Sequence, residues 1–161
     1  MTRTGPPTVL FEVFWAHQKR KRLLGQALAN VELPTEDYPF YVTIGADGPL
    51  TPTGLAEYLM MPLSTVIFRV KRLEGRGHAE RVPNPDDGRS FLIRLTPEGR
   101  RLLDEARPVF RDYAEAVEAR LGSEHVDSLT SALGALRDAI DDELDARGTS
   151  QPETRVSVPR S

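Results

Sequence analysis

Residues 62–95 read PLSTVIFRVKRLEGRGHAERVPNPDDGRSFLIRL, and this segment combines the pattern of a helix with that of a hairpin. Its first half predicts a short helix, because Val66, Val70 and Leu73 recur at a spacing that places them on one face. Pro62 suits the first helical position, where its missing N–H costs nothing. Gly77 suits the left-handed conformation that ends many helices.

The second half of the stretch predicts a tight two-stranded hairpin. Residues 78–82 form the first expected strand, and residues 91–95 alternate apolar and polar side chains as the second. Between them, the sequence NPDDG at positions 84–88 is dense in turn-forming residues. A helix with a basic outer face, followed by a hairpin with Arg89 near its tip, is the layout of a winged helix-turn-helix.

Two more helices are expected before this stretch. Thr51 and Pro52 predict the start of a short helix that ends near Leu59, and a turn at residues 60–62 leads into the next helix, which is helix-turn-helix order. Further upstream, Thr35 is the expected N-cap of a helix that runs to about residue 45. Its Pro39 lies early enough to be tolerated.

Long helices are expected at both ends of the chain. The last of them carries a narrow apolar seam at alternating spacings of three and four residues, formed by Val126, Leu129, Leu133, Leu136 and Ile140. Such a seam on an acid-rich helix requires a partner helix, and a second copy of the chain is the simplest partner. The predicted fold class is α+β and mostly helical. We predict a helical dimerisation region in residues 8–30 and 97–146, a winged helix-turn-helix region in residues 33–96 and a disordered tail in residues 147–161.

Composition excludes several classes of protein. The chain has no cysteine, so disulfides and thiolate catalysis are ruled out. The opening residues, MTRTGPP, lack the apolar core of a signal peptide, and no apolar run approaches the ~20 residues that span a bilayer. We therefore expect a soluble cytoplasmic protein with no membrane attachment.

The net charge of −3 conceals a segregation of charge along the chain. Residues 62–94 hold seven basic and four acidic side chains, a local charge of +3, whereas residues 104–145 hold four basic and twelve acidic ones, a local charge of −8. A basic patch on an otherwise acidic protein is typical of a DNA-binding surface.

Several segments resemble the MarR family of winged-helix transcriptional regulators. They are LTPTGLAEYL at 50–59, STV at 64–66, KRLEGRG at 71–77, ERVPNPDDGR at 80–89 and IRLTPEGRRLL at 93–103. The similarity is specific over residues 50–103 and extends in outline over residues 10–145. It implies a homodimer on a pseudo-palindromic operator, with two recognition helices in successive major grooves and a wing-tip arginine in the minor groove.

In this resemblance, Arg89 matches the wing-tip arginine and Asp87 matches the acid that usually orients it. The recognition helix departs from the family. Members often carry a small polar residue and then an arginine where this chain has Ile67 and Phe68, and Arg69 stands at a site that is usually aliphatic. The base-reading set is therefore unusual. Phe68 either contacts a thymine methyl group or turns away and packs.

Nine residues are the candidates for DNA contact, each with a solvated surface residue as the alternative. Phosphate contacts are expected from Ser64, Thr65, Arg72 and Arg76, base contacts from Thr65, Phe68, Arg69 and Lys71, and wing contacts from Arg89 with Asp87.

No enzyme signature is present, and neither a metal ion nor a cofactor is expected, because the three histidines are far apart and no nucleotide-binding or nucleophile motif occurs. The family's usual second function is ligand sensing. It implies a small aromatic or anionic effector between the dimer helices and the DNA-binding region. The candidate residues are Phe14, Trp15, His17, Tyr38, Tyr41 and Tyr113, with plain core packing as the alternative for each.

The sequence thus predicts a sequence-specific DNA-binding transcriptional regulator, expected to be a ligand-responsive repressor. The alternative is a winged helix that serves as a protein-interaction or dimerisation module without sequence-specific DNA binding. Ile67 and Phe68 on the outer face favour the alternative, whereas the basic face and Arg89 oppose it.

Overall fold

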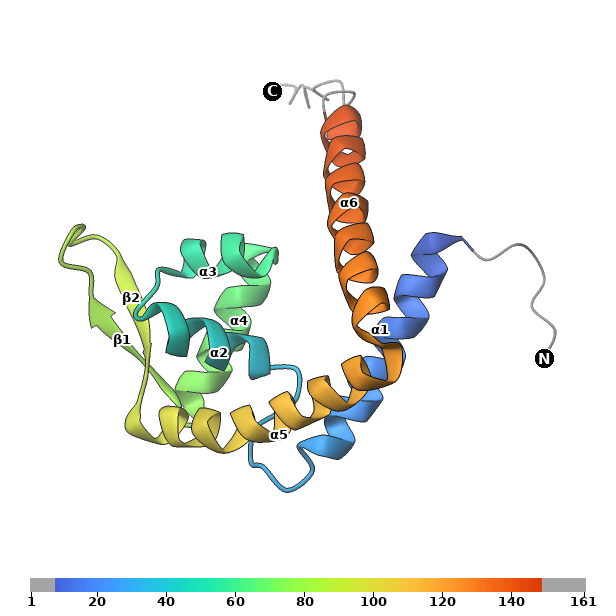
Figure 1. Ribbon diagram of the computed structural model, residues 1–161. Coiled ribbons are helices and arrows are strands. Elements are labelled where there is room, and N and C mark those ends of the chain that lie inside the picture. The colour runs from blue at the N-terminus through green and yellow to red at the C-terminus, as the bar shows by residue number, and fades with distance from the viewer. Residues whose placement is uncertain (1–7, 149–161) are drawn as a thin grey trace, which may run out of the picture. The chain divides into compact units, whose positions relative to one another are not determined.

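The computed structural model describes residues 8–148 (Figure 1). In chain order the elements are α1 (Val9–Ala27), α2 (Tyr38–Asp47), α3 (Pro52–Leu59), α4 (Leu63–Gly75), β1 (Ala79–Pro83), β2 (Phe91–Leu95), α5 (Pro97–Leu121) and α6 (Ser123–Gly148). This mostly helical α+β architecture with a small sheet confirms the predicted fold class. The described residues fall into two compact units, 8–114 and 115–148, so α5 begins in one unit and ends in the other.

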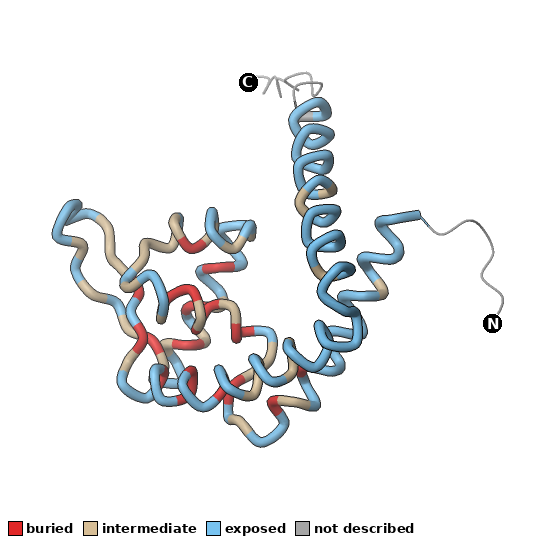
Figure 2. The backbone as a smooth tube through the Cα atoms, viewed as in Figure 1, coloured by how far each residue is buried: buried red, intermediate tan, exposed pale blue. Residues whose placement is uncertain are grey.

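The core of the first unit is formed by buried side chains of α2, α3, α4, the sheet and the start of α5, and α4 packs on α3 and β1. The predicted inner stripe of α4 is confirmed, because Val66, Val70 and Leu73 are all buried. Figure 2 shows the buried positions gathered among these elements, whereas the first turns of α1 are exposed. The apolar side chains of the core fix α4 by one face and leave its other face to solvent.

The hairpin follows the predicted strands closely. β1 and β2 pair antiparallel, from Ala79 opposite Leu95 to Pro83 opposite Phe91. Leu50 adds a short bridge to β2 through two backbone hydrogen bonds with Ile93, of 2.8 and 3.1 Å. The hairpin is thereby tied to the segment that leads into α3.

Side-chain caps begin α3 and α5, and the cap of α3 is the one that the sequence predicts. The Thr51 hydroxyl accepts a hydrogen bond of 3.0 Å from the Gly54 N–H. The Thr96 hydroxyl accepts one of 3.1 Å from the Gly99 N–H and donates one of 2.6 Å to the Gly77 carbonyl. Thr96 thus joins the start of α5 to the end of α4, which is the recognition helix of the winged helix-turn-helix. Gly77, just after α4, has the predicted left-handed backbone (φ 74°).

The expected start of α2 is wrong by two residues. The helix begins at Tyr38, with Asp37 rather than Thr35 at the N-cap position. Residues 34–37 form a turn instead, in which the Asp37 N–H donates to the Pro34 carbonyl at 2.8 Å. The reason is Pro39. It lacks an N–H and fits the first turn of a helix that starts at Tyr38, whereas an earlier start would place it in the helix interior.

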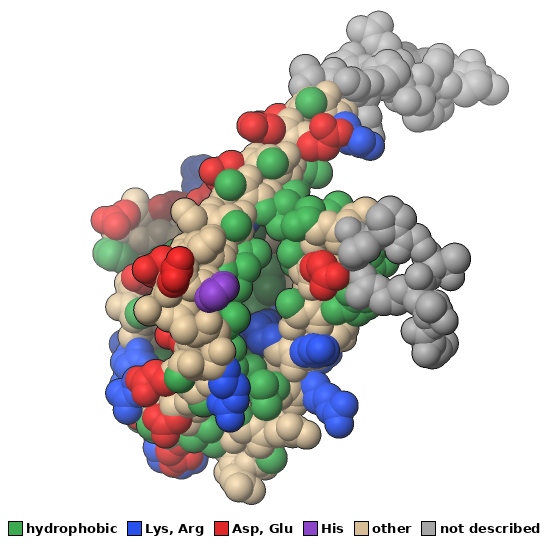
Figure 3. All heavy atoms as spheres, turned by 45° about the vertical axis from the view of Figure 1, so that its right-hand side comes forward, with side chains coloured by type: hydrophobic (Ala, Val, Ile, Leu, Met, Phe, Trp, Pro, Cys, Tyr) green, Lys and Arg blue, Asp and Glu red, His purple; other side chains and the backbone are tan. Residues whose placement is uncertain are grey.

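The second unit contains the end of α5 and all of α6, which are separated at Gly122 (φ 81°). α6 continues through Arg147 and Gly148, two residues further than predicted, and the remainder of the expected tail lies outside the described residues. Hydrophobic side chains are exposed along α6, namely Leu129, Leu133, Ile140 and Leu144. Figure 3 shows hydrophobic and acidic side chains side by side on the surface of this helix.

Gly99→Ala is expected to lower the free energy of unfolding by about 2 kcal/mol, because the added methyl group would collide with the backbone carbonyl of His78. Gly75→Ala is the matched control, since nothing lies within 4 Å of its Cβ position. Urea denaturation of both variants measures the difference. Equal midpoints for Gly99→Ala and the unchanged protein would contradict the close packing of α5 on His78.

Candidate nucleic-acid interface

The exposed face of α4 is opposite to its buried stripe. Successive helical residues rotate by about 100°, so Phe68 lies about 200° around the axis from Val66 and close to the centre of the outer face. Five of the nine DNA-contact candidates share this solvent-facing side of α4, namely Ser64, Thr65, Phe68, Lys71 and Arg72. Phe68 is the most exposed apolar residue of α4, at 59%.

Three arginines of the recognition-helix segment converge on one buried carboxylate. The side chain of Asp37 is completely buried, and its two oxygens accept hydrogen bonds from Arg69 at 2.8 Å and from Arg76 at 3.1 Å. Arg72 contributes a longer ion pair of 3.9 Å. A buried carboxylate must be paired to be tolerated. The ion pairs of this cluster therefore fix the start of α2 against arginines along α4 and just after its end.

Arg69 is consequently not grouped with the outer-face residues. Its guanidinium also contacts Glu36, at 3.3 Å, and its side chain is only 22% exposed. The hydrogen bond that Arg69 donates to Asp37 raises the pKa of the Arg69 guanidinium. The structure holds Arg69 in ion pairs with Glu36 and Asp37, and the base contact expected from the sequence stays a prediction.

Sequence reasoning missed Asp37 as a functional residue. The available signal was an acidic pair, Glu36 and Asp37, beside a proline, with an arginine at a normally aliphatic position of the next motif. That arginine, Arg69, is compensated by these two acids.

The tip of the hairpin holds Arg89 in an exposed turn. The Asp87 carboxylate accepts a hydrogen bond of 3.0 Å from the backbone N–H of Arg89, and Asn84 donates one of 2.7 Å to the Ser90 hydroxyl. Asp87 therefore shapes the backbone of the turn through the Arg89 N–H, and the orienting role that the resemblance implied for the guanidinium stays a prediction. Among residues 8–148, no acid pairs with the Arg89 guanidinium.

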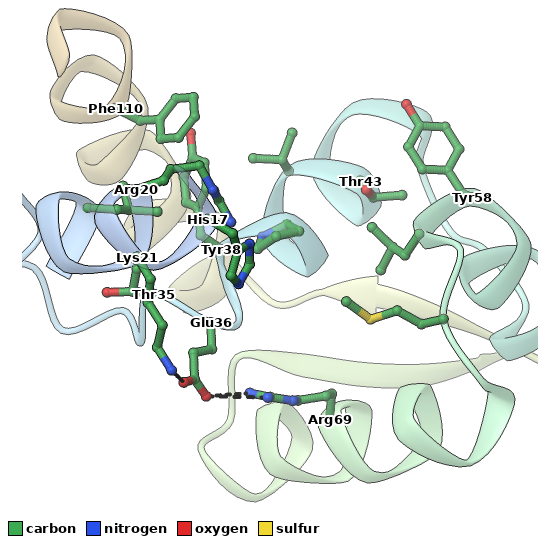
Figure 4. Close-up of a pocket in the computed structure, with 15 residues that line it drawn as sticks. His17, Arg20, Lys21, Thr35, Glu36, Tyr38, Thr43, Tyr58, Arg69 and Phe110 are labelled. Atoms are coloured by element: carbon green, nitrogen blue, oxygen red, sulfur yellow. Dashed lines mark hydrogen bonds and ion pairs between the residues drawn. The ribbon is translucent and has the colours of Figure 1, made fainter. Parts of the chain in front are cut away.

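A pocket of about 780 Å³ lies within the first unit, between α1, α2, the end of α3, the recognition helix and α5. One wall is apolar and includes Leu24, Tyr38, Val42, Leu59 and Phe110. The other is charged, and Figure 4 shows Glu36 bridging Lys21 and Arg69 there. The Lys21–Glu36 distance is 2.5 Å, and hydrogen bonds from Lys21 and then Arg69 lower the pKa of Glu36.

Of the six candidate effector-binding residues, some line the pocket and the others lie elsewhere in the structure. His17 and Tyr38 line the pocket, and Tyr38 stacks on Phe110 with ring centroids 4.8 Å apart. Phe14 is exposed, and Trp15 stacks on Phe11 in α1. Tyr113 lies next to Phe110, at 6.3 Å between centroids, without lining the pocket.

Tyr41, the remaining candidate, belongs to the core behind the recognition helix. Its hydroxyl is hydrogen-bonded to Nδ1 of His78 at 2.7 Å, and its side chain is completely buried. Burial, with Asp37 nearby, raises the pKa of Tyr41 to about 12. Burial and the positive charge of Arg76 lower the pKa of His78, which favours the neutral imidazole in the folded protein.

Acidification is expected to destabilise the fold through His78. Below the ordinary histidine pKa near 6.5 the unfolded chain binds a proton that folded His78 resists, so the free energy of unfolding falls as the pH falls. His78→Gln should reduce this slope between about pH 7.5 and 5.5. His125→Gln, at an exposed position on α6, is the control. Chemical denaturation at both pH values measures the effect, and an unchanged slope in His78→Gln would contradict it.

Within the described range 8–148, no helix is long and apolar enough to cross a bilayer. In the same part of the chain, no three histidine, aspartate or glutamate side chains are grouped as a metal site.

Comparisons with known proteins agree with this geometry. Residues 41–90 match the model of the MarR family. The multiple antibiotic resistance protein MarR of Salmonella typhimurium is 30% identical over 93 residues, which cover 58% of this chain and 65% of that protein. The match therefore spans slightly less than two thirds of that relative.

Solved structures extend the likeness over more of the chain. A "probable transcriptional regulator from Pseudomonas aeruginosa" is 29% identical, with a TM-score of 0.71 over 80% of this chain and 96% of that one. A mutant MarR of E. coli complexed with operator DNA is 25% identical, with a TM-score of 0.72 over 77% and 89%. In the sequence of residues 41–90 and in its fold, the chain is similar to the MarR family of winged-helix regulators.

Proposed function

We propose that this protein is a sequence-specific DNA-binding transcriptional regulator that acts as a repressor. The observation that carries the proposal is the combination of a solvent-facing recognition helix bearing Lys71 and Arg72 with an exposed wing-tip Arg89 that no acid in residues 8–148 neutralises. A helix of this kind fits the major groove, and an arginine on a hairpin tip suits a narrow minor groove.

The proposed acting form is a homodimer on a pseudo-palindromic operator. Two helices present exposed apolar side chains that a single chain leaves in water: Val9, Leu10, Phe11 and Phe14 on α1, and Leu129, Leu133, Ile140 and Leu144 on α6. Exposed apolar groups of this extent mark interaction surfaces. This supports the dimerisation region proposed for residues 8–30 and 97–146 and the DNA-binding region proposed for residues 33–96.

The proposal assigns no catalytic activity to the chain. Its relatives with assigned roles are regulators, and the described residues serve packing, caps and ion pairs. A regulator of this kind acts where the chromosome is, so the proposed compartment is the cytoplasm.

The test is fluorescence anisotropy with duplex DNA from immediately upstream of the protein's own gene, with random duplex as competitor at low and near-physiological salt. Tight binding that resists the competitor and weakens steeply with salt supports the proposal. Equal weak binding to both duplexes would favour the alternative, a winged-helix interaction module. The observation behind that alternative is the exposed apolar row of Leu63, Ile67 and Phe68 on α4.

We further propose that the pocket binds a small aromatic or other apolar anion. Its apolar wall suits a ring, while His17, Arg20 and Lys21 bring cationic or polar groups to the other side. A carboxylate ligand would compete with Glu36 for Lys21 and Arg69. Since Arg69 belongs to the recognition helix, ligand binding and DNA binding would be coupled through this residue if the ligand prefers one of two states.

Aromatic carboxylates are expected to raise the melting temperature and to lower the affinity for operator DNA, whereas the matching amides do neither. Arg20→Gln should weaken both effects, because Arg20 lines the pocket. Arg100→Gln, on α5 away from the pocket lining, is the control. A panel of aromatic acids that changes neither melting nor DNA binding would remove the sensing role and leave the DNA-binding proposal intact.

A further inference from the structure

We infer that Phe68 reads the C5-methyl group of one thymine in each half of the operator. This inference rests on the proposed DNA binding and goes beyond it, because it names the base and the atom that the helix recognises. Three observations support it: the position of Phe68 on α4, the contacts of its ring, and the ion pairs that hold Arg69 away from the outer face.

The first observation is position. Phe68 is near the centre of the outer face, with Ser64 one turn before it and Lys71 and Arg72 about one turn after it. At 59% exposure, its ring projects from the helix and does not pack into the core. A side chain in this place meets the floor of the major groove when the flanking cations meet the phosphates.

The second observation is the support of the ring. The guanidinium of Arg72 lies over the Phe68 ring, 6.0 Å from its centroid. Arg72 is in turn paired with the buried Asp37 at 3.9 Å. A chain of contacts therefore runs from the core to the ring, and it holds Phe68 in an outward conformation before any DNA arrives. Less conformational freedom is then lost on binding.

The third observation concerns what else could read bases. Arg69 is held by Glu36 and Asp37, so it is removed from the set of outward-facing cations on α4. The side chain at the centre of the outer face of α4 is consequently the aromatic ring of Phe68, which is a hydrocarbon. Thymine is the base that presents a hydrocarbon group in the major groove, whereas the other bases present hydrogen-bond donors and acceptors there.

The experiment begins with selection of preferred duplexes from a randomised library by the full chain. Each thymine of the selected operator is then replaced singly by deoxyuridine, which keeps the base pairing and removes only the methyl group. Three proteins are compared by anisotropy: the unchanged chain, Phe68→Ala and Ile67→Ala. Ile67 is the matched control, because it is exposed and apolar but lies about 100° around the helix from Phe68.

For the unchanged protein, we expect about fourfold weaker binding when one particular thymine loses its methyl group, the value for one buried methyl. The affinity of Phe68→Ala should not change on that replacement. The affinity of Ile67→Ala should show the same fourfold loss as that of the unchanged protein. A melting temperature of Phe68→Ala equal to that of the unchanged chain is expected, because the truncated side chain is exposed, and melting curves check that this variant is folded.

Other outcomes are equally decisive. A selected operator with no methyl-sensitive thymine, or equal sensitivity in Phe68→Ala, would overturn the reading of thymine and leave sequence-specific DNA binding standing. Failure to select any duplex would overturn both proposals and direct attention to a protein partner for the outer face.

Discussion

Replacement of Asp37 by asparagine is expected to lower the free energy of unfolding by about 3 kcal/mol. Asparagine keeps the size of the side chain and removes its charge. The hydrogen bonds from Arg69 and Arg76 then lose their ionic component, and both guanidinium groups lose the carboxylate that compensates them. The loss is smaller than for a fully buried cation, because Arg76 remains 36% exposed and can be hydrated.

Asp47→Asn is the matched control, since Asp47 is an exposed acid at the other end of α2. Urea denaturation gives the stability difference. DNA affinity measured well below the midpoint should also fall in Asp37→Asn, because Asp37 sets the position of α4. If both variants unfold at the same urea concentration, the arginine cluster contributes nothing to the fold.

Arg89→Ala is expected to weaken operator binding about 30-fold without changing the unfolding midpoint, on the order of 1 kcal/mol for each of two wings. Arg89 has no packing role, since it is exposed in the turn at the hairpin tip. Its backbone N–H still donates to Asp87 when the side chain is alanine, so the shape of the turn is preserved.

Arg94→Ala on the same hairpin separates wing-tip binding from a general loss of positive charge. Arg94 is exposed but paired with Glu80 at 2.8 Å. Its removal should change binding by no more than about twofold, as for an exposed ion pair. Anisotropy at one fixed salt concentration compares the two variants. Equal dissociation constants for Arg89→Ala and the unchanged chain would show that the wing tip stays clear of the DNA.

The sequence was most informative where local chemistry determines structure. The apolar stripe of Val66, Val70 and Leu73, the Thr51 cap and the NPDDG turn each depend on neighbours within a few residues, and the structure agrees with all of them. The mostly helical winged-helix fold followed from their order. The predicted start of α2 was wrong because two local signals favour different starts. Thr35 prefers an N-cap position, whereas Pro39 fits the first turn of a helix that begins at Tyr38.

The candidate site was less predictable, because its charges are distributed by contacts between residues far apart in sequence. Nothing near Arg69 in the chain indicates that its partner is Asp37, 32 positions earlier. Helical spacing alone assigned Arg69, Arg72 and Arg76 to the DNA side. The aromatic candidates were likewise separable only in three dimensions, where Tyr38 lines a pocket and Tyr41 is enclosed beside His78.

The burial of Asp37 beneath an exposed reading face has a genetic consequence for the proposed homodimer. Lesions at Asp37 should reduce the amount of folded protein, so a normal gene copy would compensate for them and they would be recessive and temperature-sensitive. Lesions at Lys71 or Arg89 should leave abundant, well-folded subunits that pair with normal ones and spoil half of each reading surface. Such alleles would be dominant, and the two phenotypes would divide the protein along the boundary between its Asp37 cluster and its outer face.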